Sequence, residues 1–258
     1  MYEDELAIDE LAVLDAEVGR ESPFDPLDDI PLIGEEEEVK PNPDNMLLLL
    51  HHPEKDQRLL GARAFGEIEE PRAIPYLIGM LSDPCPDVRV SCAYALGRNT
   101  SPMAVAPLIA QFQRDENDDA RKGIVWALGN TRDPRVVEPL CDALKTDIDV
   151  VRLWAASGLG QTPKISYEAM IKATPPLIGA MRRDPVPSVR SNCAWAIGQI
   201  CAELPSNVVY ATAIDALIEA FAEDEELGVK EDARTAILSV GDSRGLQVIE
   251  EIEQDGYF

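Results

Sequence analysis

The sequence predicts an all-α fold, an α-solenoid of about six short helical hairpins that follows an acidic, mostly disordered N-terminal leader. Two observations lead to this prediction. A segment in which Gly lies eight residues after Arg recurs along most of the chain, and a Pro-Leu-Ile-like segment alternates with it. Both segments place apolar residues at the i, i+3, i+4 and i+7 positions, which is the spacing of an amphipathic helix.

The predicted leader spans residues 1–44. It holds 16 acidic and 2 basic side chains, so it carries a large part of the net charge of −25. Four glutamates run from Glu35 to Glu38, and prolines interrupt the segment repeatedly. Such a segment repels itself and buries too little apolar surface to offset the entropy of ordering. The apolar residues scattered among its acids leave two interpretations open, a solubilising tail and a segment that folds on a partner.

The repeats occupy the rest of the chain, residues 45–258. Successive arginines of the first segment are 31, 32, 31 and 38 residues apart. One helical hairpin cannot bury its apolar face alone, whereas stacked hairpins form a continuous core. Clear copies of the first segment begin at Arg58, Arg89, Arg121, Arg152 and Arg190, and a degraded sixth copy begins at Lys230.

The repeated arginines have acidic residues nearby. Asp56, Asp87 and Asp119 each lie two residues before one of them. This spacing predicts a ladder of charge pairs along the stack. Exposed ion pairs contribute only about 0–1 kcal/mol each, so we expect the ladder to fix the orientation of the repeats rather than to supply stability.

The repeats resemble a known family. Segments Arg89–Gly97 and Arg121–Gly129 are most similar to HEAT repeats, in the short form found in the phycobilin lyases of cyanobacteria. The resemblance covers residues 47–252. It implies an α-solenoid in which the Arg-bearing helices line the concave face. HEAT arrays bind many unrelated partners, so the resemblance says less about function than about fold.

Aromatic residues recur on the Arg-bearing helices. With Arg as position zero, positions +3, +4 and +7 form an apolar stripe, so positions +1, +2, +5 and +9 should face outward. Aromatic side chains on an open surface are typical binding hot spots, although packing against the adjacent repeat is the alternative interpretation. The predicted partner-binding set consists of Arg63, Tyr94, Arg98, Trp126, Asn130, Trp154 and Trp195.

The composition argues against several classes of function. A net charge of −25 disfavours binding to nucleic acid or to anionic lipid. The sequence has neither a long uncharged apolar window nor the basic-then-apolar start of an export signal, which predicts no membrane insertion and a cytoplasmic protein. An odd count of five cysteines fits reduced thiols rather than a disulfide framework.

The chemistry-bearing residues do not form a catalytic or metal-binding motif. The cysteines never occur as Cys-x-x-Cys, and Cys92 and Cys193 share one small buried position of the repeat. Cys85 falls in a turn, which leaves open a metal shared with a partner's thiols. The adjacent His51 and His52 point about 100° apart on a helix, which favours a capping turn over chelation. We therefore predict no catalytic residue, no intrinsic metal or cofactor and no enzymatic activity.

Two functions follow from these observations. The first is a non-enzymatic adaptor that binds a protein partner on its concave face. The acidic leader and the ending Gly241-Asp-Ser-Arg are similar to cyanobacterial HEAT-repeat proteins that partner the IscA iron–sulfur scaffold. That resemblance implies iron–sulfur assembly or iron homeostasis, with the cluster held mainly by the partner. The alternative is a phycobilin lyase subunit or phycobilisome-associated factor whose tryptophans stack on a bilin.

Overall fold

The computed structural model describes residues 41–254, which belong to the compact unit Lys40–Phe258. This part of the chain contains thirteen α-helices and no β-strand, which confirms the all-α prediction. The first helix begins at Pro43, just before the predicted boundary at residue 45. The rest of the predicted leader, residues 1–40, lies outside the described residues.

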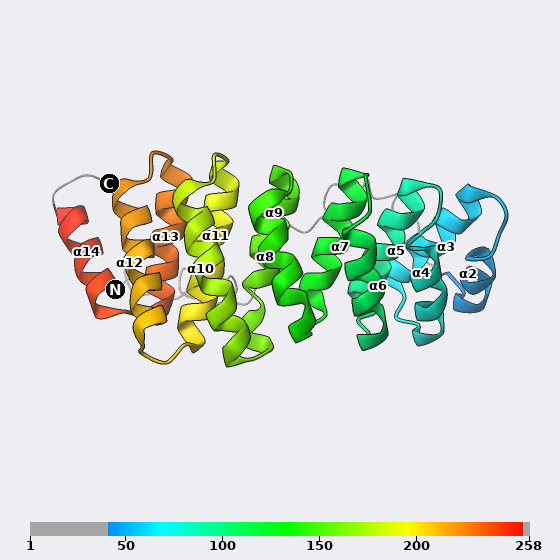
Figure 1. Cartoon of the computed structure of the whole chain (residues 1–258), viewed down its shortest axis with the longest axis horizontal. Coiled ribbons are helices and arrows are strands. Elements are labelled where there is room, and N and C mark those ends of the chain that lie inside the picture. The colour runs from blue at the N-terminus through cyan, green and yellow to red at the C-terminus, as the bar shows by residue number, and fades with distance from the viewer. Residues whose placement is uncertain (1–40, 255–258) are drawn as a thin grey trace, which may run out of the picture. The chain divides into compact units, whose positions relative to one another are not determined.

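The helices form six consecutive hairpins, which lie side by side in chain order (Figure 1). Their first helices are α2 (Pro43–Leu49), α4 (Ile74–Met80), α6 (Pro102–Phe112), α8 (Val137–Thr146), α10 (Tyr167–Arg183) and α12 (Val208–Glu223). Their second helices are α3 (Lys55–Glu67), α5 (Pro86–Arg98), α7 (Asp118–Asn130), α9 (Asp149–Leu159), α11 (Pro187–Glu203) and α13 (Leu227–Val240). A further helix, α14 (Ser243–Gln254), follows the sixth hairpin, and 3₁₀ turns η1 (Pro71–Ala73), η2 (Pro134–Val136) and η3 (Thr162–Lys164) precede α4, α8 and α10.

The helix ends follow from local sequence. Ser101, Asn117 and Asn207 each cap a helix, because their side-chain oxygens accept hydrogen bonds from backbone N–H groups of the first turn. Proline at the start of α5 costs no hydrogen bond, since that N–H would be unpaired. Gly241 ends α13 in the left-handed conformation (φ 73°), which glycine adopts readily.

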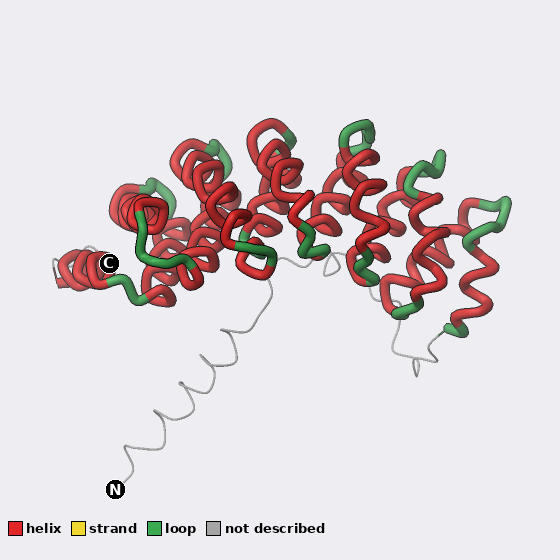
Figure 2. Tube along the Cα trace, turned by 60° about the horizontal axis from the view of Figure 1, so that its bottom comes forward, coloured by secondary structure: helices red, strands yellow, loops and turns green. Residues whose placement is uncertain are grey.

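The helices form two layers. The Arg-bearing helices α3, α5, α7, α9 and α11, together with α13, pack against one another and form what we call the inner layer. Their backbones approach closely. A Cβ atom added to Gly129 of α7, for example, would lie only 2.8 Å from the Cα of Gly158 of α9. The first helices of the hairpins and α14 form the outer layer. The closer spacing of the inner layer places it on the inner side of the bend visible in Figure 2.

The two longer repeats accommodate their extra residues mostly as helix. The insertion near residues 162–170 forms η3 and the first turn of α10, which is 17 residues long. The second insertion, near residues 204–210, lies where α11 of 17 residues gives way to α12 of 16 residues. Tyr167 and Asn207 join the two insertions through a hydrogen bond of 3.2 Å.

The core runs through all six hairpins, and the last one differs from the others on its outward side. Positions +4 and +8 of each Arg-bearing helix are small or aliphatic because the next helix packs there. In α13 these positions hold Arg234 and Leu238. Arg234 instead forms an ion pair with Glu253 of α14, and Leu238 is exposed. The polar Arg234 at +4 is typical of the outward face of a terminal repeat.

Candidate partner-binding surface

A ladder of buried ion pairs joins each of the five Arg-bearing helices, α3 to α11, to the next hairpin. Arg89 donates from Nε and Nη2 to the two carboxylate oxygens of Asp115, each at 2.7 Å. Its Nη1 donates to the backbone carbonyl of Asp83 at 2.9 Å. The same bidentate pairing joins Arg58 to Asp83, Arg121 to Asp147, Arg152 to Asp184 and Arg190 to Asp224.

The predicted acidic partners of the ladder were wrong. The partner is the aspartate in the turn of the next hairpin, not Asp56, Asp87 or Asp119 two residues before the arginine. Those three are exposed because position −2 lies on the open side of the helix, away from the turn that faces the guanidinium. The actual pairs are largely buried, and the carboxylate of Asp115 is 0% exposed. Together these pairs fix the orientation of successive hairpins.

Three aspartates of the ladder, Asp83, Asp115 and Asp224, have lowered pKa values. Burial raises the pKa of Asp115, but the hydrogen bonds from Arg89 and Gln111 lower it by more than burial raises it. The pKa of Asp115 therefore lies below its usual value. The pKa values of Asp83 and Asp224 are lowered for the same reason, through Arg58 and Arg190. These carboxylates are therefore engaged in ion pairs within the stack.

The open side of the inner layer faces away from the outer layer. On α7 the side chains on this side are those at positions −2, +1, +5 and +9, all of them at least partly exposed, and we call this side of every inner-layer helix the inner face. The members on α7 are Asp119, Lys122, Trp126 and Asn130. Position +2, also expected to face solvent, is buried between helices in α5, α7, α9 and α11 and is exposed only in the terminal helices α3 and α13.

The expectation that all the aromatic residues face solvent was wrong for Tyr94 and Trp154. Tyr94 is 8% exposed, and Trp154 is 5% exposed. Position +2 of one helix meets position +5 of the preceding one, since a Cβ atom on Gly123 would lie 3.6 Å from the Tyr94 ring. Trp154 occupies that +2 position on α9, so its indole fills space between helices and belongs to the core.

Trp126 and Trp195 are half-buried and pack against the core at the edge of the inner face. Each indole lies over a glycine of the preceding inner-layer helix. A Cβ atom at Gly97 would overlap the Trp126 ring, and one at Gly160 would lie 2.6 Å from Cζ3 of Trp195. In these two repeats the glycine at +8 therefore makes room for the indole of the next repeat, and each indole remains partly exposed.

The other predicted residues lie at different places on the same face. The guanidinium carbon of Arg98 lies 6.0 Å from the centre of the Trp126 ring, and Tyr94 meets Trp126 edge-on at 5.3 Å. Asn130 lies one turn beyond Trp126 on α7 and is partly exposed. Arg63 is exposed on α3. The structure thus clusters Tyr94, Arg98 and Trp126, while Trp195 stands on α11, two inner-layer helices beyond α7.

Sequence reasoning missed the uncharged character of the inner face between the two exposed indoles. All four inner-face positions on α9 and all four on α11 lack charge. We call these eight residues, with Trp126 and Asn130 of α7, the inner panel. The signal in the sequence that could have revealed the inner panel is the absence of charged residues at positions −2, +1, +5 and +9 of two successive repeats. The eight are Val150, Leu153, Ser157, Gln161, Ser188, Ser191, Trp195 and Gln199; Ser157 is buried, the other seven are at least partly exposed, and Gln161 lies just past the end of α9.

The thiols and acids do not gather into a metal site in the part of the chain that the structure describes. No group of three or more His, Cys, Asp or Glu there has metal-binding geometry. Burial raises the pKa of the Cys141 thiol to about 11 and that of Cys201 to about 12. Cys92 and Cys193 are fully buried, as predicted, and Cys85 is half-buried.

Within residues 41–254, no helix combines the length and the apolar character needed to cross a bilayer.

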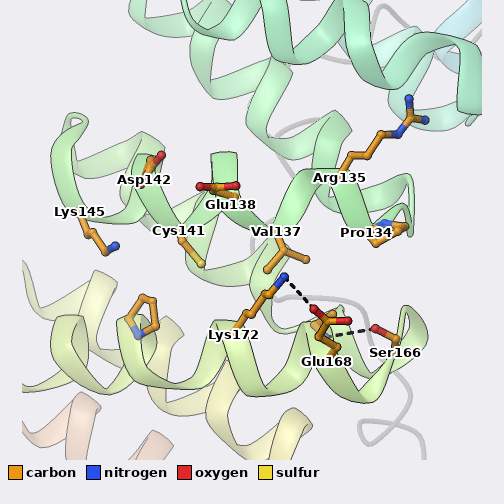
Figure 3. Close-up of a pocket in the computed structure, with 12 residues that line it drawn as sticks. Pro134, Arg135, Val137, Glu138, Cys141, Asp142, Lys145, Ser166, Glu168 and Lys172 are labelled. Carbon is orange, nitrogen blue, oxygen red and sulfur yellow. Dashed lines mark hydrogen bonds and ion pairs between the residues drawn. The ribbon is translucent and has the colours of Figure 1, made fainter.

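A pocket of about 550 Å³ lies in the outer layer between α8 and α10 (Figure 3). Its walls carry three cationic and three anionic side chains. Lys172 pairs with Glu168 at 2.9 Å, and Cys141 lies on the α8 wall. Opposite charges in equal number give the pocket no net attraction for one kind of ion. The charged lining residues are Arg135, Lys145, Lys172, Glu138, Asp142 and Glu168.

Family models match most of the repeat region. The model described as HEAT repeats matches residues 43–122, 81–160 and 105–198, and the PBS lyase HEAT-like repeat matches residues 189–223. A sequence comparison with curated proteins finds no match.

Solved structures of helical repeat proteins share the fold. A designed armadillo repeat protein in complex with the peptide (KR)4 is 18% identical, with a TM-score of 0.58, over 77% of this chain and 98% of that one. Kap121p is 15% identical, with a TM-score of 0.61, over 76% of this chain and 23% of that one. The CpcE–CpcF phycocyanin lyase of Nostoc sp. is 26% identical, with a TM-score of 0.52, over 65% of this chain and 99% of that one. Because the HEAT-repeat model matches more than half of the sequence, the chain belongs to the HEAT-repeat family.

Proposed function

We propose that the chain is a non-enzymatic adaptor that binds a protein partner on the inner face of its solenoid. The observation that carries this proposal is the inner panel, an uncharged surface edged by the half-exposed Trp126 and Trp195 in a chain of net charge −25. Indoles held rigidly at the edge of a surface supply contact area at low entropic cost, which is the property of binding hot spots.

The internal contacts of the stack favour this role over catalysis. The buried charges of the inner layer are engaged with one another in the Arg–Asp ladder, so they are not available as acids, bases or nucleophiles. The side chains that the inner panel offers to a ligand are amides, hydroxyls, indoles and two aliphatic groups. Structural neighbours support a protein partner, since one of them is in complex with a peptide and another is a complex of two subunits.

The partner that the sequence suggests is an IscA-like iron–sulfur scaffold, which would place the chain in iron–sulfur assembly or iron homeostasis. In this version of the proposal the partner supplies the cluster ligands. The thiols of this chain agree with that division, because Cys85 is half-buried and its four other cysteines are buried. Capture of the full chain's partner from cell extract, followed by mass spectrometry, tests the identity; recovery of partners that never include an iron–sulfur scaffold would contradict it.

Site-specific photo-cross-linking tests the binding face. We place a photoreactive amino acid at Ser191 on the inner face of α11 and, as the matched control, at Gln113 at the end of α6 in the outer layer. The proposal predicts a cross-linked partner from position 191 and none from position 113. Cross-links formed only from position 113 would move the binding site to the outer layer.

A second candidate function is supported by the likeness to the CpcE–CpcF phycocyanin lyase and by the PBS lyase HEAT-like repeat at residues 189–223. In this version the chain is a lyase subunit or phycobilisome-associated factor, and Trp126 and Trp195 stack on a bilin. Mixing the protein with phycocyanobilin should then shift the visible absorption band to the red. An unchanged spectrum with no pigment retained after gel filtration would exclude this candidate.

A further inference from the structure

Three side-chain amides occupy the same position, +9, in three successive repeats. Asn130 is the last residue of α7, Gln161 lies two residues past the end of α9, and Gln199 lies in the last part of α11. All three are at least partly exposed. Among the described residues, none of these three amide groups has a hydrogen-bond partner. Asn99, one residue later at +10 relative to Arg89, instead donates to the carbonyls of Phe65 in α3 and Ala95 in α5 and accepts from the N–H of Glu70.

The inner panel carries no charge at any of its positions, and the exposed Glu203 lies one helical turn beyond Gln199 on α11. Charge returns at the panel's borders, with Asp119 and Lys122 on α7 and Glu231 on α13. In a protein with 28% charged residues this is a distinct patch. A partner segment that covers it therefore needs no charge, because a charged residue would lose its hydration here without gaining an opposite charge.

The amides decide which uncharged partner fits. If the apolar face of a helix covered them, each amide would lose its water and leave a donor and an acceptor unpaired, at a cost of about 1–3 kcal/mol per group. An extended main chain offers the reverse, because every residue presents a free N–H and a free C=O. A side-chain amide, with both a donor and an acceptor, can pair with both groups.

The spacing of the helices sets the length of that segment. Packed helices lie about 8–10 Å apart, and an extended chain advances about 3.3 Å per residue, so each inner-layer helix corresponds to about three residues. A segment that reaches from Asn130 to Gln199 therefore has roughly six to seven residues. Trp126 and Trp195 stand on the first and last of these three helices, where they can contact apolar side chains of the segment.

We propose that the inner panel binds an extended, uncharged segment of the partner through main-chain hydrogen bonds to Asn130, Gln161 and Gln199. This inference rests on the proposed function and specifies its ligand. The segment is recognised mainly by its backbone, with the two indoles selecting apolar side chains near its ends.

The test selects short random peptides displayed on phage against the immobilised full-length chain and measures the affinity of the enriched peptides by calorimetry. The proposal predicts enriched peptides with an uncharged core. The N130A/Q161A/Q199A variant should bind them more weakly, by about fivefold to tenfold for each amide removed. Gln113→Ala, which removes an exposed amide from the outer-layer side, should leave the affinity unchanged. Urea unfolding of each variant verifies that the fold is retained.

N-methylation of single peptide amides separates main-chain from side-chain recognition. The proposal predicts that methylation at about every third position weakens binding, whereas alanine substitution of the intervening side chains does not. Enrichment of peptides that bind the triple amide variant as well as the wild type would overturn the main-chain proposal and leave the adaptor function standing. Enrichment of charged peptides would overturn it too. A failure to enrich any peptide would count against both.

Discussion

Asp115 is shared by two hairpins. Its carboxylate accepts two hydrogen bonds of 2.7 Å from Arg89 of the preceding inner-layer helix, and its backbone carbonyl accepts one of 3.1 Å from Arg121 of the helix that follows it. The same arrangement recurs at Asp83, Asp147 and Asp184. Each of these turn aspartates therefore links the inner-layer helix that follows it to the inner-layer helix before it. The ladder in this way sets how successive inner-layer helices are aligned along their axes.

Asp115→Asn should destabilise the protein strongly. The substitution keeps the shape of the side chain but leaves the guanidinium of Arg89 buried without its charge partner, and breaking one half of a buried ion pair costs about 3–5 kcal/mol. Urea unfolding followed by circular dichroism measures the loss. The matched control is Asp118→Asn, whose carboxylate is 61% exposed in its ion pair with Arg121 and should contribute less than about 1 kcal/mol. Equal losses in the two variants would contradict the ladder's role.

Acid should unfold the stack through the same residues. The pKa values of Asp83, Asp115 and Asp224 are lowered in the folded state, so these groups add stability above the pKa of the unfolded chain, near 3.9, and lose it as the pH falls through their folded-state values. The melting temperature should therefore fall steeply below about pH 4. Because the substitution removes one of these titrating groups, the slope should be shallower in Asp115→Asn, and an identical slope would contradict this assignment.

Gly97→Ala should destabilise the contact between the second and third hairpins. The new methyl group would overlap the Trp126 ring, and overpacking of this kind costs about 1–3 kcal/mol. The matched control is Gly66→Ala, at the equivalent position of α3, where a Cβ atom meets nothing within 4 Å. Gly66→Ala should be neutral or slightly stabilising, since alanine favours the helix. Comparison of the two urea midpoints provides the test.

Trp154→Ala and Trp126→Ala should separate packing from recognition. Trp154 is a core residue at 5% exposure, so its truncation should cost about 3–5 kcal/mol of stability. Trp126 is only half-buried, and its truncation should cost less stability but weaken partner binding. Urea unfolding and partner affinity are measured on both variants. A greater loss of stability in Trp126→Ala than in Trp154→Ala would contradict the different burial of the two indoles.

The repeat pattern was sufficient to predict the hairpins, because helix period, glycine position and turn prolines recur at nearly constant spacing. It also identified the arginine ladder from Arg58 to Arg190. The ladder's partners could not be predicted from local spacing, since Asp115 lies 26 residues from Arg89 and only stacking brings the two together. Nearby acids such as Asp87 looked equally suitable in the sequence.

The candidate site was predictable only in part for a related reason. A helical wheel separates the apolar stripe from the rest of a helix, but it does not show how far the neighbouring helix covers position +2 or position +5. Tyr94 at +5 and Trp154 at +2 are covered, while Trp126 and Trp195, also at +5, stay half-exposed. Tyr94 is covered because Gly123 and Trp126, which belong to the next repeat, lie against its ring.

Hydrogen–deuterium exchange of the full chain with and without its captured partner is the most direct test that the inner face is the binding surface. The account predicts slower exchange in α9 and α11, around Leu153, Gln161 and Gln199, with the outer-layer helices α8 and α10 unchanged. Protection confined to α8 and α10, with α9 and α11 exchanging as in the free protein, would contradict it.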